Sequence, residues 1–402
     1  MSTVSIVIPI YNSSPFLRMC IGSIVRQTHD DIDVVCVDDG STDDSVLVLE
    51  EFAKKDSRIR IICNDNEHKG AAGARNRGLE AARGQYVIFL DSDDFFDSRM
   101  IETLVQKAED TKAEIVVCTG QAYDNERERV VGKMPHPDLE YVPEGSYFNW
   151  KSCAEYICEI VDNYSWNKLY KRSFLTENKL DFTPIPVSED QYISMIAPVL
   201  AKRIAVVKEA FINYRINTGN SLCDSKASFP TGAYEGTYRV LKQYKELGVW
   251  RHVKQSYLNV ALRLMREYFD SMPEYSKALF LYNKYRDEIF PMLEATDLPE
   301  DYFHDNRVGD WYRMITNASF GEIMFEAARA SGSIMTTASL RFRVPYERIK
   351  KNSRVVLVGK GLEGRYWYSQ LLLSNHCEVV CWIDKMDEIP KGVVFDEVIE
   401  VG

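Results

Sequence analysis

The chain has 402 residues, enough for two or three domains of roughly 150 residues each with real hydrophobic cores. Hydrophobic residues make up 45% and charged residues 27%, an ordinary globular balance, and no apolar run reaches the ~20 residues of a membrane helix. The formal net charge of −11 repels a phosphate backbone, which disfavours general nucleic-acid binding.

The N-terminus leads straight into the strand-like run 4–8, without the basic and apolar regions of a signal peptide. The nine cysteines are odd in number and lack framework spacing, which indicates reduced thiols rather than disulfides. We therefore expect a cytoplasmic protein with no transmembrane segment. This expectation is compatible with peripheral contact at the inner face of a membrane.

Apolar, β-rich runs alternate with helix-like stretches from residue 4 to about residue 118. Strands are expected over 4–10, 33–37, 58–63 and 85–90, and helices over 15–27, 43–55 and 72–82. Such alternation predicts right-handed βαβ units on a mostly parallel sheet, an α/β fold. Between residues 124 and 147, charges, prolines and glycines predict a loop or insertion over the sheet.

The rest of the chain changes character twice. Apolar residues at helical spacing over 234–247, 249–269 and 275–292 predict a helical domain, placed at 223–350. From residue 351 the strand-like run 355–358 leads into G-x-G-x-x-G, and Asp384 ends a second strand. This pattern predicts a partial Rossmann-like βαβ unit at 351–402, too short for a complete dinucleotide fold.

Unusual side chains follow three of the predicted strands. In an open parallel sheet the ligand site lies outside the carboxyl ends of the strands. The first strand ends in Pro9 and Tyr11, the second leads into Asp39, and a later strand leads into Asp91 and Asp93. An aromatic ring and several carboxylates are therefore expected at one edge of the sheet.

Asp91 and Asp93 follow the strand that ends at residue 90. Because side chains alternate along a strand, both carboxylates are expected on one face. Two close carboxylates suit Mg²⁺ or Mn²⁺, whose octahedral shell phosphate oxygens complete. The alternative is that these acidic residues are turn formers or a helix N-cap.

Asp39 has a second interpretation besides a turn aspartate. Beside Tyr11, its carboxylate can accept the N3 hydrogen of uracil while the tyrosine ring stacks on the base. The stretch 68–77 is a small-residue loop that leads into a helix, and such a helix start favours anions. Arg75 is the residue of this stretch that we retain as a ligand contact.

Glu189 and Asp190 come just before the helical run 191–200. A carboxylate beside a reacting hydroxyl can act as a general base. The alternative is strong, because the helix macrodipole alone favours acidic residues in this position.

Read together, these motifs resemble the inverting family 2 glycosyltransferases with the GT-A fold, over residues 3–222. No single motif is decisive, but their order and spacing are highly specific. The matching segments are 4–12, 27–28, 37–43, 70–78, 84–94, 166–170 and 189–190.

The resemblance implies a set of site residues. The residues implied to bind the nucleotide are Pro9, Tyr11, Asp39, Arg75, Asp91 and Ser92. Asp93 is implied to bind the metal. The implied general base is Asp190, with Glu189 as the second candidate. The implied cofactor is Mn²⁺ or Mg²⁺.

The implied reaction is a single in-line displacement. The hydroxyl of a saccharide or lipid-linked acceptor attacks the anomeric carbon of a nucleotide-sugar donor, a UDP-sugar on the uracil argument, and the nucleoside diphosphate leaves. The family suggests cell-envelope or capsular polysaccharide synthesis. Two alternatives are a nucleotidyltransferase, which the lack of a Gly-rich N-terminal loop disfavours, and a non-catalytic binding protein, which the retained carboxylates disfavour.

Overall fold

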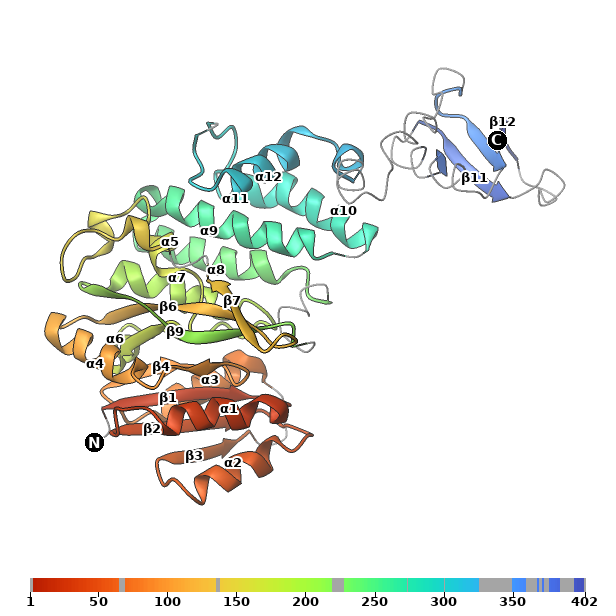
Figure 1. Cartoon of the computed structure of the whole chain (residues 1–402). Helices are drawn as coiled ribbons and strands as arrows, with labels where there is room; N and C mark the ends of the chain where they lie inside the picture. The colour runs from red at the N-terminus through yellow and green to blue at the C-terminus, as the bar shows by residue number, and fades with distance from the viewer. Residues whose placement is uncertain are drawn as a thin grey trace. The chain divides into compact units, whose positions relative to one another are not determined.

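A computed structural model describes residues 3–64, 69–134, 138–218, 228–272, 274–299, 301–324, 349–358, 367–368, 371, 376–383 and 394–400. The chain divides into two compact units, residues 1–281 with 287–309 and residues 282–286 with 310–402. The first unit holds the large sheet and the second a small one (Figure 1). The domain boundaries expected from the sequence, at 222 and 350, stay predictions.

A mixed sheet forms the centre of the first unit. Among the described residues its nine strands run in the order β3-β2-β1-β4-β8-β6-β9-β5, with β7 beside β6. Pairing is parallel through β3, β2, β1 and β4 and between β6 and β9, and antiparallel around β8, β5 and β7. The strands are β1 (Val4–Ile10), β2 (Ile32–Asp38), β3 (Ile59–Cys63), β4 (Tyr86–Phe89), β5 (Phe95–Phe96), β6 (Ile115–Asp124), β7 (Arg129–Lys133), β8 (Lys168–Lys171) and β9 (Ile204–Ile216).

Helices pack on this sheet, and a helical layer adjoins the β6–β9 half (Figure 1). The helices close to the strands are α1 (Ser14–Val25), α2 (Ser45–Ala53), α3 (Gly70–Ala81), α4 (Met100–Thr111) and α6 (Arg172–Glu177). Those of the helical layer include α5 (Ile157–Val161), α7 (Gln191–Leu200), α8 (Gly232–Glu246) and α9 (Trp250–Asp270). The predicted helices and strands of this unit occur close to their expected bounds, which confirms the α/β class.

The central strand β1 is apolar on both faces because helices cover both sides of a parallel sheet. Its carboxyl end lies beside those of β2 and β4. The Asp39 amide donates to the Ile10 carbonyl (2.8 Å), and the Leu90 amide donates to the Val7 carbonyl (3.0 Å). The loops after these three strands therefore meet at one edge, as the sequence predicts.

The stretch 124–147, expected as a loop or an insertion over the sheet, contains a strand that the sequence did not predict. Strand β7 pairs antiparallel with the end of β6, and a 3₁₀ turn follows at Leu139–Tyr141. All residues of β7 are exposed, so the strand has no buried face and shows none of the alternation by which a strand is recognised from sequence.

The second unit contains a three-stranded parallel sheet in the order β11-β10-β12. Its strands are β10 (Arg354–Val358), β11 (Glu378–Ile383) and β12 (Glu397–Glu400). The first two confirm the predicted strands, whereas the glycine motif at 359–364 and Asp384 lie outside the described residues. The division between the units falls within α10 (Tyr275–Lys284) and within α12 (Asn306–Asn317), whereas α11 (Phe290–Met292) belongs to the first unit.

Close packing of α3 on β1 generates a stability prediction. A Cβ at Gly78 would lie 2.2 Å from Cγ1 of the buried Val7, so Gly78→Ala should lower the free energy of unfolding by about 1–3 kcal/mol. The matched control is Gly22→Ala in α1, whose Cβ would meet only the end of the Arg26 side chain at 3.2 Å. Urea denaturation should find the control neutral or stabilised by up to about 1 kcal/mol. Equal stability of the two variants would contradict this packing.

Candidate active site

Tyr11 and Asp39 follow β1 and β2 at the shared edge. Tyr11 is 47% exposed, whereas Asp39 is buried. The Asp39 carboxylate accepts hydrogen bonds from the Asn64 side chain (2.6 Å) and from the amides of Lys69 (3.1 Å) and Gly70 (2.8 Å). It thereby anchors the start of α3, the helix that carries Arg75. Pro9 lies within β1, one strand position before its end.

The acidic turn after β4 follows a different geometry from the predicted one. The strand ends at Phe89 and Asp91–Asp93 lie in a turn, so the argument from strand alternation is wrong. The two carboxylates still interact: burial raises the pKa of Asp93 to about 6, and the negative charge of Asp91 contributes. The Ser92 hydroxyl lies 2.8 Å from that of Ser13.

Arg215, near the end of β9, lies against this turn and is almost fully buried. Its Nε donates to the Asp93 carbonyl (2.7 Å), its amide to Asp94 Oδ1 (2.7 Å) and its Nη1 to Asn125 Oδ1 (2.9 Å). The other carboxylate oxygen of Asp94 is buried and has no hydrogen-bond partner among the described residues. Three aromatic rings surround the guanidinium at 5.2–5.3 Å from their centroids, those of Phe16, Phe95 and Tyr123.

Arg75 joins two parts of the site that are distant in sequence. Its Nη2 donates to Asp91 Oδ1 (2.7 Å) and its Nη1 donates to Glu189 Oε1. The side chain is 6% exposed and its guanidinium also lies over the Phe182 ring. Burial alone would lower the pKa of Arg75, but the charges of Asp91 and Glu189 raise it, so the guanidinium stays charged.

Asp190 is the first residue beyond the N-terminus of α7, yet its side chain makes no capping hydrogen bond. Its Oδ2 accepts instead from the Ser165 amide (3.2 Å). Burial and the negative charge of the neighbouring Glu189 together raise the pKa of Asp190 to about 7, although the positive charge of Arg75 opposes the shift. This carboxylate therefore changes protonation state near neutral pH, whereas Glu189 is bound in an ion pair with Arg75.

The acidic turn after β4 lacks a complete set of metal ligands of its own among the described residues. In the part of the chain that the structure describes, no group of three acidic, histidine or cysteine side chains could hold an ion alone. Mg²⁺ and Mn²⁺ are commonly held by one or two carboxylates together with substrate phosphates. Asp93, whose pKa is raised to about 6 by burial and by the charge of Asp91, fits that arrangement because a cation would offset both effects.

The structure thus brings together Arg75, Asp91, Glu189 and Asp190, with Asp93 on the same turn. Tyr11, Asp39 and Pro9 lie at the same sheet edge. Arg215 and Lys168, which are both buried, were not among the site residues predicted from the sequence. A basic residue inside an apolar run was the available signal, because a buried charge needs a partner.

Comparisons with known proteins agree with this geometry. Residues 5–177 match the family model described as glycosyl transferase family 2. The chain is 31% identical over 262 residues to the putative glycosyltransferase EpsH of Bacillus subtilis, an alignment that covers 62% of this chain and 72% of that protein. The chain belongs to glycosyl transferase family 2.

One further relative and one solved structure extend the comparison. This glycosyltransferase is 28% identical to the Campylobacter jejuni GalNAc(5)-diNAcBac-PP-undecaprenol beta-1,3-glucosyltransferase, over 61% of this chain and 73% of that enzyme. The crystal structure of S. aureus TarS 1-349 in complex with UDP-GlcNAc matches with a TM-score of 0.55 at 17% identity, over 78% of this chain and 92% of that one. That likeness confirms the GT-A fold. The chain spans less than two thirds of the length of several other glycosyltransferases that it matches.

The buried contacts of Arg215 predict a large cost for its loss. Arg215→Met leaves the Asp93 carbonyl and Asn125 without a donor, so the free energy of unfolding should fall by about 3 kcal/mol. The control is Arg99→Met, whose side chain is 61% exposed and whose ion pairs are at the surface; it should change stability by less than about 1 kcal/mol. Similar unfolding midpoints in urea for the two variants would refute the assigned contacts.

Proposed function

We propose that this glycosyltransferase is an inverting, metal-dependent enzyme that moves a sugar from a UDP-sugar to an acceptor hydroxyl. The observation that carries the proposal is the Arg75 bridge. It holds a donor-side carboxylate, Asp91, and a base-side carboxylate, Glu189, in one cluster with Asp190 beside it.

The donor side is assigned to the edge formed by β1, β2 and β4. The exposed Tyr11 ring supplies a stacking surface for a base, and Asp39 next to it supplies an acceptor for the N3 hydrogen of uracil. Pro9, Arg75, Asp91 and Ser92 complete the proposed nucleotide side. Arg75 would act mainly by positioning Asp91, because its guanidinium is buried.

Asp93 would hold Mn²⁺ or Mg²⁺. When bound, such a cation stabilises negative charge on a departing diphosphate. In the proposal Asp93 supplies one carboxylate, and Arg215 fixes the turn on which that carboxylate lies.

Asp190 would act as the general base. The ideal pKa of such a group lies close to the working pH, and burial brings the pKa of Asp190 to about 7. The Asp190 side chain makes no capping hydrogen bond, whereas Glu189 forms an ion pair with Arg75. A water or hydroxyl next to Asp190 would lose its proton to this carboxylate as it attacks the anomeric carbon.

The acceptor is proposed to be a saccharide, free or linked to a lipid, in the synthesis of a cell-envelope or capsular polysaccharide. The described chain has no helix with the length and hydropathy needed to cross a bilayer. We propose that the enzyme acts in the cytoplasm and meets lipid-linked acceptors at the membrane surface.

A nucleotide panel tests the donor side. We expect UDP with Mn²⁺ to raise the melting temperature more than GDP, ADP or CDP, since binding stabilises the native state by mass action. Asp93→Asn should remove the Mn²⁺-dependent part of this rise. The control, Asp97→Asn, changes a carboxylate that is 41% exposed and should keep it. A larger shift with GDP or ADP would contradict the uracil assignment, and an unchanged Mn²⁺ effect in Asp93→Asn would contradict the metal assignment.

Loss of the base should separate turnover from binding. With the UDP-sugar from which the parent protein releases UDP fastest, Asp190→Asn should lower turnover by on the order of 10² to 10⁴ while calorimetry finds the UDP affinity nearly unchanged. Parental turnover should rise with pH through about 7, because only the deprotonated carboxylate accepts a proton.

The matched control is Asp181→Asn, a partly exposed carboxylate paired with Arg239. It should keep both rate and affinity. A folded Asp190→Asn variant that releases UDP at the parental rate would move the base to Glu189 or elsewhere.

A further inference from the structure

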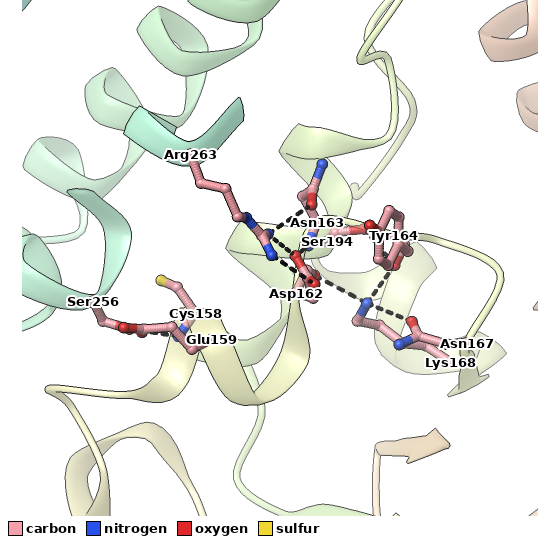
Figure 2. Close-up of polar contacts among 10 residues, drawn as sticks. All are labelled: Cys158, Glu159, Asp162, Asn163, Tyr164, Asn167, Lys168, Ser194, Ser256 and Arg263. Atoms are coloured by element: carbon pink, nitrogen blue, oxygen red, sulfur yellow. Dashed lines mark hydrogen bonds and ion pairs between the residues drawn. The ribbon is translucent and has the colours of Figure 1, made fainter. Parts of the chain in front are cut away.

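A buried polar network surrounds the turn between α5 and β8, residues 162–167 (Figure 2). Side chains from this turn, from the first residue of β8 and from α7 and α9 meet there. Most residues of the turn are buried. The network adjoins Asp190, because the amide of Ser165, a residue of this turn, donates a hydrogen bond to Asp190 Oδ2.

Lys168 is fully buried at the centre of this network. Its Nζ donates to the Asp162 carbonyl (3.1 Å), to Asn167 Oδ1 (2.8 Å) and to the Tyr164 carbonyl. Burial lowers the pKa of Lys168 to about 7, and the negative charges of Asp162 and Asp190 oppose that shift. Three acceptors require the three hydrogens that only the ammonium form carries, so the geometry favours a charged Lys168.

Arg263 of α9, in the helical layer, stabilises the same turn. Its Nη2 donates to Asp162 Oδ1 (2.5 Å), and the Asn163 amide donates to the same oxygen (2.7 Å). Asp162 has a φ of 53°, which is unfavourable for a residue other than glycine. Such a conformation persists where its surroundings hold it, and Arg263 and Lys168 hold its side chain and its carbonyl.

A single peptide group connects this network to Asp190. The Tyr164 carbonyl accepts from Lys168 and from the Ser194 hydroxyl (3.1 Å), and the Ser165 amide donates to Asp190 Oδ2 (3.2 Å). The carbonyl of residue 164 and the amide of residue 165 belong to one planar peptide unit. Fixing the carbonyl therefore fixes the direction of the N–H that Asp190 accepts.

We propose that Lys168 is a positioning residue for Asp190, which it orients by holding the Tyr164–Ser165 peptide group, and that Arg263 supports the same turn. The inference deepens the proposed function and rests on Asp190 being the base. Lys168 has no direct role with substrate, since its three hydrogens are taken by the turn.

The charged groups around Asp190 predict a second measurable effect of Lys168, on the pH dependence of turnover. Asp190 faces Glu189, Arg75, Asp91 and Lys168, and Lys168 faces Asp162, Asp190 and Cys118. Removing the Lys168 charge takes away a cation that favours the ionised base. The pH at which turnover reaches half its maximum should therefore move upward, by about half a unit or more.

The decisive experiment is a double-mutant cycle with Lys168→Met and Asp190→Asn. UDP release from the donor that the parent prefers is measured in the complete chain, with water as the acceptor where no saccharide is added. Lys168→Met alone should lower turnover by roughly 10-fold to 100-fold, shift the pH profile upward and leave the UDP affinity unchanged. Added to Asp190→Asn, it should cause little further loss.

Controls keep the inference separable from a general loss of stability. Arg60→Met removes a partly buried arginine paired with Asp33, away from this turn, and should lower the melting temperature without moving the pH profile. If Lys168→Met does not fold, Ser194→Ala removes only one hydrogen bond to the Tyr164 carbonyl and should lower turnover several-fold, again only when Asp190 is present.

The results distinguish the positioning role of Lys168 from the assignment of Asp190 as the general base. Equal fold-losses from Lys168→Met, or from Ser194→Ala, in both backgrounds would show a role independent of Asp190 and overturn the inference alone. Unchanged turnover in these variants would also overturn it. Unchanged turnover in Asp190→Asn itself would overturn the base assignment, and the inference with it.

Discussion

One buried guanidinium connects the two sides of the site. Arg75 bridges Asp91, after β4, to Glu189, before α7; the contact with Glu189 is buried, and the Asp91 side chain is 25% exposed. Since a buried charge without a partner is very unfavourable, the three side chains must assemble together. Asp39, which anchors the start of α3, fixes the direction of the helix that carries Arg75. The relative position of the proposed donor side and the proposed base side therefore depends on this helix and this ion cluster.

Two further buried cations hold the turns next to the other carboxylates of the proposed site. Arg215 holds the turn of Asp93 and Asp94 from within an aromatic cage, and Lys168 holds the turn that donates to Asp190. These carboxylates still have raised pKa values, because burial outweighs the nearby positive charge. A site with such carboxylates is suited to bind a cation at one position and to accept a proton at another, which is what the proposed reaction requires.

Much of this arrangement was predictable from the sequence. The apolar runs of β1, β2 and β4 and the polar residues after them placed Tyr11, Asp39 and Asp91 at one edge, because carboxyl ends of parallel strands meet there. The contact between Arg75 and Glu189 depends on tertiary packing of segments more than 100 residues apart, which no local pattern encodes. Burial of Lys168 and Arg215 has the same origin. Strand β7 escaped detection because all of its residues are exposed.

The central claim is that Arg75 and Glu189 form one cooperative unit, and a double-mutant cycle on stability tests it most directly. The free energy of unfolding is measured by urea denaturation for the parent, Arg75→Met, Glu189→Gln and the double variant. We expect Arg75→Met to lose about 3–5 kcal/mol, because it leaves Asp91 and Glu189 without their cation. The double variant should be more stable than the sum of the single losses allows, by on the order of 2 kcal/mol. Losses that simply add would show that the two side chains do not interact and would contradict the account.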